Sequence, residues 1–113
     1  MTTRVAVLLC SLSFAACASP SITGEQAHAL VDTQRAVLLD VRTPDEFRER
    51  HLGGAVNLPV QALEAREAEV PAKPDQDVIV YCRSGHRSAR AAELLKARGF
   101  SKVHDLGSMS NWR

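Results

Sequence analysis

The chain is poor in cysteine and in aromatic residues. Its 113 residues include 3 Cys, 3 Phe, 1 Tyr and 1 Trp. No Cys-x-x-Cys pair is present, which argues against a dithiol oxidoreductase. Cys10 and Cys17 lie in an N-terminal leader, so the folded domain is expected to keep only Cys82. A domain with one thiol has no disulfide framework, and its unpaired cysteine is a candidate for reactivity.

The chain also lacks an apolar run that is long enough to cross a bilayer. Its apolar stretch, residues 5–16, is shorter than the roughly 20 residues of a spanning helix. The stretch follows Arg4 and precedes small residues and Pro20, which is the order of an export signal. A buried terminal helix would need polar positions at helical spacing, and the stretch has none. We therefore expect the protein to leave the cytoplasm.

Two processing sites fit this leader. Ala16-Cys17-Ala18 matches an A-x-A-like site, which predicts a signal peptide of residues 1–18 and a single mature domain of residues 19–113. Phe14-Ala15-Ala16-Cys17 resembles a bacterial lipobox, with Phe in the place where Leu is usual. This alternative predicts a lipoprotein signal of residues 1–16 and a lipid on Cys17, which would be the protein's only membrane contact.

Charge is unevenly distributed, although the formal net charge is only +1. Residues 19–77 carry six Lys/Arg and eleven Asp/Glu, whereas residues 78–113 carry seven and two. The basic segment contains Cys82 and would favour a small anionic substrate if its charges converge there. The alternative is a solvated basic helix face, and Arg90, Lys96 and Arg98 are expected to belong to such a face. Neither the composition nor any motif indicates nucleic-acid binding.

The stretch around Cys82 has the pattern of a strand, a tight turn and a helix. A β-branched run, residues 78–81, leads into Cys82. Ser88, with Arg87, opens an alanine- and leucine-rich helix that Gly99 would end. In such a unit the loop N–H groups and the helix N-terminus favour an anion. Gly85 supplies a residue that can take a positive φ and curl the loop. This arrangement would stabilise Cys82 as a thiolate.

Two interpretations of Cys82 compete. A lone Cys after a buried strand is often a small core residue. The residues that follow are instead typical of a basic loop: Arg83, Ser84, Gly85, His86 and Arg87. Because electropositive surroundings mark reactive thiols, we favour a nucleophile. A metal site of Cys82 and His86 would have too few ligands, and we expect no metal or other cofactor.

Strand and helix patterns alternate along the rest of the chain. Helix-start signals stand at Thr23 with Gln26, and at Thr43-Pro44 with Glu46. Helices are predicted over residues 24–31, 44–50 and 60–69, strands over 36–41, 55–58 and 102–106, and a terminal turn over 107–112 that docks Trp112. This alternation predicts an α/β fold with a mainly parallel central sheet flanked by helices. Ligands of such sheets lie at the carboxyl ends of the strands, where Cys82 is expected.

Several ordered motifs resemble the rhodanese family of sulfurtransferases. They are Asp40-Val41-Arg42-Thr43-Pro44-Asp45-Glu46-Phe47, His51-Leu52-Gly53-Gly54-Ala55-Val56-Asn57-Leu58-Pro59, the loop from Cys82 to Arg87, and the ending from Gly107 to Trp112. With its leader, the chain is similar to the small single-domain periplasmic rhodaneses. The resemblance implies a rhodanese-like three-layer fold and a periplasmic location, and nothing in the sequence requires more than a monomer. The chain departs from the family at Ser108, where a second glycine is common, and this change affects the rim of the site.

The resemblance also implies thiosulfate sulfurtransferase activity. Cys82 would take the sulfane sulfur of thiosulfate, release sulfite and carry a persulfide. A thiophilic acceptor such as cyanide or a thiol would then remove that sulfur. Loop N–H groups from Arg83 to Ser88 would hold the persulfide anion. Arg87 matches the loop-closing arginine of the family and would also attract anions.

The other side chains in these motifs have less specific roles. Arg83 fits either a contact with the thiosulfate sulfonate or a solvated surface charge. His86 fits either a polarising group or a passive loop residue. Asp40 and Arg42 match the family's Asp-Val-Arg motif and are interpreted as supporting residues, with Arg42 paired to an acid. His51 is expected to cap a turn.

Two other functions remain as alternatives. A phosphatase or arsenate reductase on a related scaffold needs a C-x5-R loop, because an oxyanion must be surrounded by more N–H groups and a bidentate Arg. Here Arg87 follows Cys82 after four residues, and the next position is Ser88. A non-catalytic rhodanese-like binding module usually lacks the loop cysteine, which this chain keeps. Sulfur transfer is therefore the favoured hypothesis.

Overall fold

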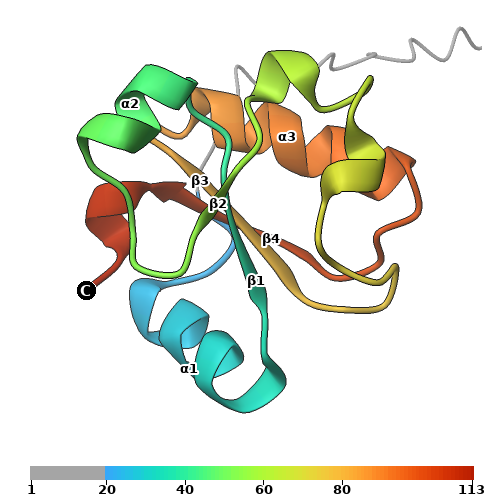
Figure 1. Cartoon of the computed structure of the whole chain (residues 1–113). Coiled ribbons are helices and arrows are strands. Elements are labelled where there is room, and N and C mark those ends of the chain that lie inside the picture. Colours follow the sequence, from blue (N-terminus) through green and yellow to red (C-terminus); the bar gives the residue numbers. More distant parts are fainter. Residues whose placement is uncertain (1–19) are drawn as a thin grey trace, which may run out of the picture.

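Four short strands form the sheet at the centre of the computed structural model, which describes residues 20–113 (Figure 1). They are β1 (Val37–Asp40), β2 (Val56–Asn57), β3 (Val78–Cys82) and β4 (Val103–Ser108). Their order is β2-β1-β3-β4, and all three pairings are parallel. The predicted α/β fold with a parallel sheet is confirmed. The predicted export signal and both of its processing sites lie outside the described residues.

Both faces of the sheet are buried, because successive side chains of a strand point to opposite sides. In β3, Val78, Val80 and Cys82 pack in one apolar cluster with α3 (His86–Ala97). The intervening Ile79 and Tyr81 pack in a second cluster with α1 (Gly24–Gln34). Figure 1 shows these two helices on opposite sides of the sheet. Cys82 therefore lies on the α3 side, at the carboxyl end of a central strand.

The helices α1 and α2 (Pro44–Glu49) start at the predicted capping boxes. The Thr23 side chain accepts a hydrogen bond from Gln26 N, and the Gln26 side chain accepts one from Thr23 N. Thr43 and Glu46 are paired in the same way at the start of α2. Such pairs satisfy backbone donors that have no partner inside the helix.

Among the described residues, no helix combines the length and apolar character needed to cross a membrane.

Residues 60–69 do not form the predicted helix. They form two 3-10 turns, η1 (Val60–Ala62) and η2 (Glu67–Glu69). Leu63 is buried as predicted, and Ala62 is half-buried. Four residues after Leu63, where a helix would continue its apolar stripe, the chain has Glu67. A full helix over this segment would bury little additional apolar surface, so packing does not favour it.

The helix after Cys82 begins slightly earlier than predicted. α3 starts at His86 and not at Arg87 and Ser88, because Gly85 adopts a left-handed conformation (φ 99°) and caps the helix. The Gly85 carbonyl accepts the first helical hydrogen bond, from Ala89 N. The predicted positive φ of Gly85 is confirmed, and Gly99 also has one (φ 97°). The spacing of apolar residues in the sequence predicts which side of this helix is packed. The first residue of the helix is instead determined by the turn at Gly85.

The end of the chain also differs from its prediction. β4 continues past Leu106 to Ser108, and a short turn, η3 (Met109–Asn111), follows. A register shift in the β3–β4 pairing, between Val80 and Tyr81, keeps β4 beside β3 as far as Cys82, which pairs with Ser108. Trp112 docks as expected, because its ring centroid lies 3.7 Å from that of His28 on α1. The extension places Ser108 next to the nucleophile candidate.

Candidate active site

Cys82 ends β3 with a fully buried side chain. Its Sγ accepts a hydrogen bond from the backbone N–H of Gly85, with an N–S distance of 2.9 Å. The Sγ also lies 3.5 Å from Oγ of Ser88, which donates to the Gly85 carbonyl at 3.0 Å. The loop between β3 and α3 is therefore closed over the thiol by its own glycine and by the first turn of the helix.

The first turn of α3 presents further backbone N–H groups near this thiol. The first N–H groups of a helix have no acceptor within the helix. Within residues 20–113, no group accepts a hydrogen bond from the amides of His86, Arg87 or Ser88. Together with the positive end of the helix dipole, these amides favour an anion at the cysteine loop.

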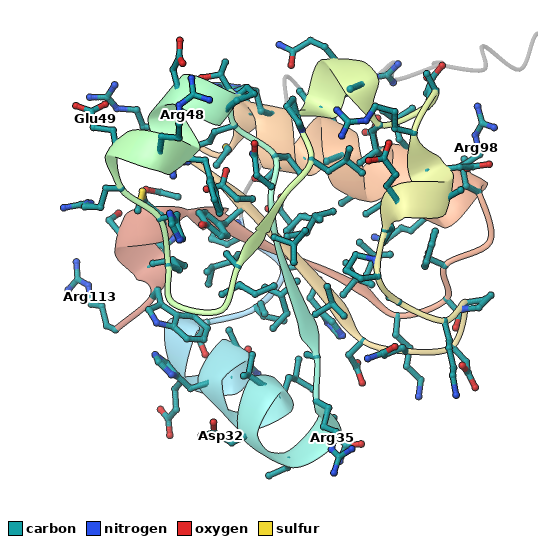
Figure 2. The ribbon with its side chains drawn as sticks, in the orientation of Figure 1. Asp32, Arg35, Arg48, Glu49, Arg98 and Arg113 are labelled. Carbon is teal, nitrogen blue, oxygen red and sulfur yellow. The ribbon has the colours of Figure 1, made fainter. Side chains whose placement is uncertain are left out.

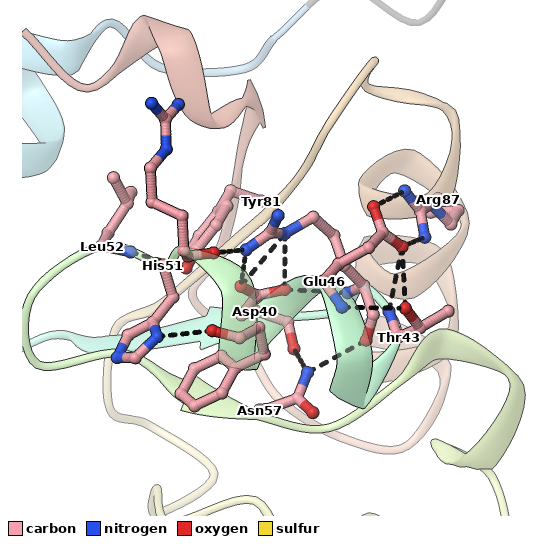
Figure 3. Close-up of polar contacts among 11 residues, drawn as sticks. Asp40, Thr43, Glu46, His51, Leu52, Asn57, Tyr81 and Arg87 are labelled. Atoms are coloured by element: carbon pink, nitrogen blue, oxygen red, sulfur yellow. Dashed lines mark hydrogen bonds and ion pairs between the residues drawn. The ribbon is translucent and has the colours of Figure 1, made fainter.

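Arg87 connects the start of α3 to α2. Its guanidinium makes two hydrogen bonds to the Glu46 carboxylate, Nη1–Oε1 at 2.6 Å and Nη2–Oε2 at 3.0 Å (Figure 3). The side chains are 28% and 23% exposed. The hydrogen bond from Arg87 lowers the pKa of Glu46 to about 2, and the same bond raises the pKa of Arg87. The loop is thereby tied to α2, and the Arg87 charge is largely matched by Glu46.

We expect Glu46→Gln to weaken the pH dependence of stability in acid. Gln keeps the capping box with Thr43 but removes the carboxylate that binds Arg87. The folded-state pKa of Glu46 lies below its ordinary value of 4.5. Its ionisation therefore stabilises the fold above pH 4.5, and this contribution is lost as the pH falls from about 4.5 to about 2.

Thermal unfolding of the wild type and Glu46→Gln from neutral pH to about pH 2 measures this effect. At neutral pH the variant should be less stable by about 1 kcal/mol, because the ion pair is partly exposed. Glu69→Gln is a matched control, since it removes an ion pair with Arg66 that is more exposed. It should alter the pH dependence less. Identical acid unfolding of the wild type and Glu46→Gln would contradict the prediction.

Asp40 and Arg42 lie on the α1 side of the sheet, opposite Cys82. The Asp40 carboxylate accepts from Arg42 Nη2 at 2.7 Å and from Arg42 Nε at 3.1 Å (Figure 3). Their side chains are 0% and 6% exposed. The guanidinium also lies 5.8 Å from the centroid of the Tyr81 ring. The predicted pairing of Arg42 with an acid is confirmed, and the acid belongs to the same Asp-Val-Arg motif.

Three other side chains hold the loops at this edge of the sheet (Figure 3). Tyr81 Oη accepts from the backbone N–H of Leu52 at 3.1 Å, and burial raises the pKa of Tyr81. Asn57 Nδ2 donates to the carbonyls of Asp40 and Arg42 at 3.0 and 2.9 Å. His51 Nδ1 lies 2.7 Å from the carbonyl oxygen of Phe47, at the end of α2. His51 thus occupies the position expected of a turn-capping side chain.

The remaining predicted residues of the loop are exposed. Arg83 and Ser84 follow the nucleophile candidate, and His86 opens α3. Across the described part of the chain, neither Arg83 nor His86 has an ion-pair partner. The structure therefore separates the two loop arginines, because Arg87 is engaged by Glu46 and Arg83 is free to meet a ligand.

Comparison with known families and structures connects this geometry to a family. The Rhodanese-like domain family matches residues 23–113, which include the whole sheet and the cysteine loop. The chain belongs to this family. The rhodanese-like domain is similar to a sulfurtransferase from Allochromatium vinosum, with 38% identity over 84 residues that cover 74% of this chain and 77% of the relative.

Two further relatives support the assignment of this rhodanese-like domain. Thiosulfate sulfurtransferase PspE from Escherichia coli (strain K12) is 32% identical over 73 residues, which cover 65% of this chain and 70% of the relative. The human single-domain sulfurtransferase TSTD1 superposes with a TM-score of 0.71 at 26% identity, covering 83% of this chain and 95% of the human one. The protein is therefore a transferase of the rhodanese type, and the predicted family is confirmed.

Sequence reasoning missed three residues that organise this rhodanese-like domain around its site. Glu46 was assigned only to a helix start, although a capping carboxylate keeps further lone pairs for another donor. A tyrosine on a buried strand, such as Tyr81, needs a partner for its hydroxyl. A half-buried amide on a short edge strand, such as Asn57, likewise needs acceptors. These requirements signal that partners exist, but they do not say where in the chain those partners lie.

Proposed function

We propose that this rhodanese-like domain transfers sulfane sulfur through a persulfide on Cys82. The main support is the position of the Cys82 Sγ atom. It accepts a hydrogen bond from the Gly85 N–H, and it lies at the start of α3, where backbone amides have no acceptor among the described residues. Such donors stabilise a thiolate, and they would equally stabilise the terminal sulfur of a persulfide. The similarity to the E. coli thiosulfate sulfurtransferase supports thiosulfate as the donor.

The reaction divides into two displacements. In the first, the Cys82 thiolate attacks the sulfane sulfur of thiosulfate, the S–S bond of thiosulfate breaks, and sulfite leaves with the electron pair. In the second, cyanide or a thiolate attacks the outer sulfur of the persulfide, and Cys82 leaves as a thiolate. Atoms and electrons balance in both steps without an added oxidant or reductant.

The donor must reach a thiol that has no exposed surface in the resting structure. Gly85 and Ser88 contact Sγ, and the exposed Arg83 and Ser84 connect Cys82 to them. Uptake of sulfur therefore requires movement of this loop or rotation of the Cys82 side chain. A persulfide extends one bond beyond Sγ, so its outer sulfur is easier to reach than the thiol itself.

The geometry also indicates separate roles for the side chains near Cys82 in binding the donor and in holding the loops. Arg83, exposed and without an ion pair among the described residues, would attract the thiosulfate sulfonate. Arg87 is bound by Glu46 and would act mainly on loop structure. Asp40, Arg42 and His51 would support the surrounding loops, and His86 remains available near the helix start.

We further propose that the full chain is exported to the periplasm as a monomer. The support is the leader pattern, with its alternative sites before Cys17 and after Ala18. The mass of the mature N-terminal peptide distinguishes the two processing sites, because only the first leaves a lipid on Cys17. Recovery of unprocessed chain from the cytoplasm would contradict export.

The persulfide is directly testable by intact-mass analysis. After incubation with thiosulfate and removal of small molecules, the protein should gain the mass of one sulfur atom. Addition of cyanide should remove it and yield thiocyanate. Sulfate is a matched control, since it has no sulfane sulfur. An unmodified protein, or hydrolysis of p-nitrophenyl phosphate at a rate comparable to sulfur transfer, would overturn the assignment.

A further inference from the structure

The hydroxyl of Ser88, in the first turn of α3, faces the sulfur of Cys82. Ser88 has no exposed surface. In the resting structure the Cys82 thiol donates to Ser88 Oγ at 3.5 Å, and the Ser88 hydroxyl donates to the Gly85 carbonyl at 3.0 Å. Within residues 20–113, Ser88 Oγ and the Gly85 amide are the two groups within hydrogen-bonding distance of Sγ. The hydroxyl therefore contacts the atom at which bonds would form and break.

This series of hydrogen bonds depends on the thiol proton. When Cys82 is a thiolate, Sγ has no proton to donate, and the lone pairs of the Ser88 oxygen would face a negative sulfur. Rotation of the hydroxyl about its C–O bond turns the hydrogen towards Sγ without moving a heavy atom. The Gly85 carbonyl still accepts from Ala89 N, at 3.1 Å. The reversal therefore leaves neither Ser88 nor the buried carbonyl without a partner.

The position of negative charge differs between the thiolate and the persulfide. In a persulfide anion the charge lies on the outer sulfur, one bond beyond Sγ, and it returns to Sγ when the S–S bond breaks. A donor that faces Sγ is therefore most effective in the step in which Cys82 departs. In the first displacement the same donor stabilises the thiolate before it attacks, which makes the thiolate less nucleophilic. The Ser88 hydroxyl thus affects the two displacements in opposite directions.

Charged side chains do not duplicate the contact made by Ser88. Within the described part of the chain, none of them makes a hydrogen bond to Sγ. Arg87 is bound by Glu46. Arg98 follows the opposite end of α3 and extends from the edge of the molecule (Figure 2). The hydroxyl is therefore the side chain placed to respond to charge on Sγ.

We propose that Ser88 is a catalytic residue of sulfur delivery, and that its hydroxyl turns from the Gly85 carbonyl to Sγ as Cys82 departs. The inference rests on the proposed function of Cys82. Cyanide attacks the outer sulfur of the persulfide anion and forms a C–S bond, and the S–S bond breaks with its electron pair on Sγ. Thiocyanate leaves, and Sγ remains as a thiolate that accepts from Ser88. In loading by thiosulfate Sγ loses charge, so an ionised Cys82 gains no rate from this donor.

The test measures the two displacements separately in Ser88→Ala. Single-turnover loading by thiosulfate, and removal of the sulfur from loaded protein by cyanide, are followed by intact mass at about pH 10, where free thiols are mostly ionised. Delivery should be about fivefold slower than in the wild type, as expected when one hydrogen bond to a partly charged atom is lost. Loading should not slow, because a less stabilised thiolate is the better nucleophile.

Two further variants assign the effect to the hydroxyl. Ser88→Thr keeps a hydroxyl, and in a helix the threonine Oγ1 can bond the carbonyl three residues earlier, which here belongs to Gly85. It should restore delivery to within about twofold of the wild type. Ser101→Ala is the matched control, since it also removes a hydroxyl that donates to a backbone carbonyl, that of Pro74, at an exposed position. It should leave both rates unchanged.

The outcomes separate this inference from the proposed function. Failure of thiosulfate to load the wild type would overturn the proposed function of Cys82. Normal loading with unchanged delivery in Ser88→Ala would overturn the role of Ser88 alone. Equal slowing of both displacements, or the same loss of delivery in Ser88→Thr as in Ser88→Ala, would show that Ser88 only shapes the loop, and this result would also overturn the inference.

Discussion

Cys82→Ser is expected to abolish sulfur transfer from thiosulfate to cyanide while it preserves the fold. A serine hydroxyl has nearly the shape of the thiol and can still accept from Gly85 N–H and face the Ser88 hydroxyl. It cannot form a persulfide, so both displacements are lost. Removal of a covalent nucleophile lowers turnover by several orders of magnitude, and we expect a loss of roughly 10⁴-fold or more.

Steady-state production of thiocyanate measures the loss, and thermal unfolding checks the fold. The chain offers the same substitution at two other positions, Cys10 and Cys17, in the leader. A variant with both leader cysteines replaced by serine should transfer sulfur at the wild-type rate. Thiocyanate production by Cys82→Ser within a hundredfold of the wild type would assign the sulfur chemistry to another group.

Arg42→Met is expected to cause the largest loss of stability. Arg42 makes three side-chain hydrogen bonds to the fully buried carboxylate of Asp40. Without the guanidinium, that carboxylate is left buried without its counter-ion. Breaking a buried ion pair in this way typically costs about 3–5 kcal/mol of unfolding free energy. The change acts on folding, because Asp40 and Arg42 lie on the face of the sheet opposite Cys82.

Urea unfolding of the wild type and Arg42→Met measures this cost. The double variant Asp40→Leu/Arg42→Met removes both charges and should recover much of the lost stability, since no unpaired carboxylate remains. Arg48→Met, which breaks the exposed pair with Asp45, should cost less than about 1 kcal/mol. Equal stability of Arg42→Met and Arg48→Met would show that the buried pair contributes no more than a surface pair.

The parts of the fold that sequence patterns predicted correctly are those specified locally. Residues 78–82 form a strand with every side chain buried, as their β-branched run indicates. The capping boxes at Thr23 and Thr43 depend on residues three positions apart, so their helix starts were correct. The helix predicted over residues 60–69 was wrong, because composition favours a helix there while Glu67 stands where packing needs an apolar side chain.

The same division between local and long-range information applies to the site. The turn at Gly85 and the position of Cys82 follow from adjacent residues, and both were predictable. The partner of Arg87 is Glu46, which lies 41 positions away and meets it only through the folded sheet. A hollow between α2, the loop and the end of β4 is likewise formed by distant segments, and its lining includes Ser108, in the unpredicted extension of β4.

The covered position of Cys82 has a consequence for oxidative damage. A sulfenic acid at a cysteine is usually rescued when a nearby thiol converts it to a disulfide, and further oxidation to a sulfinic acid is irreversible. Residues 20–113 contain no second cysteine that could act in this way. Redox-sensing cysteines are exposed and often adjacent to a resolving cysteine, and Cys82 has neither property. The loop formed by Gly85 and Ser88 thus acts as a shield that limits peroxide access to the resting thiol.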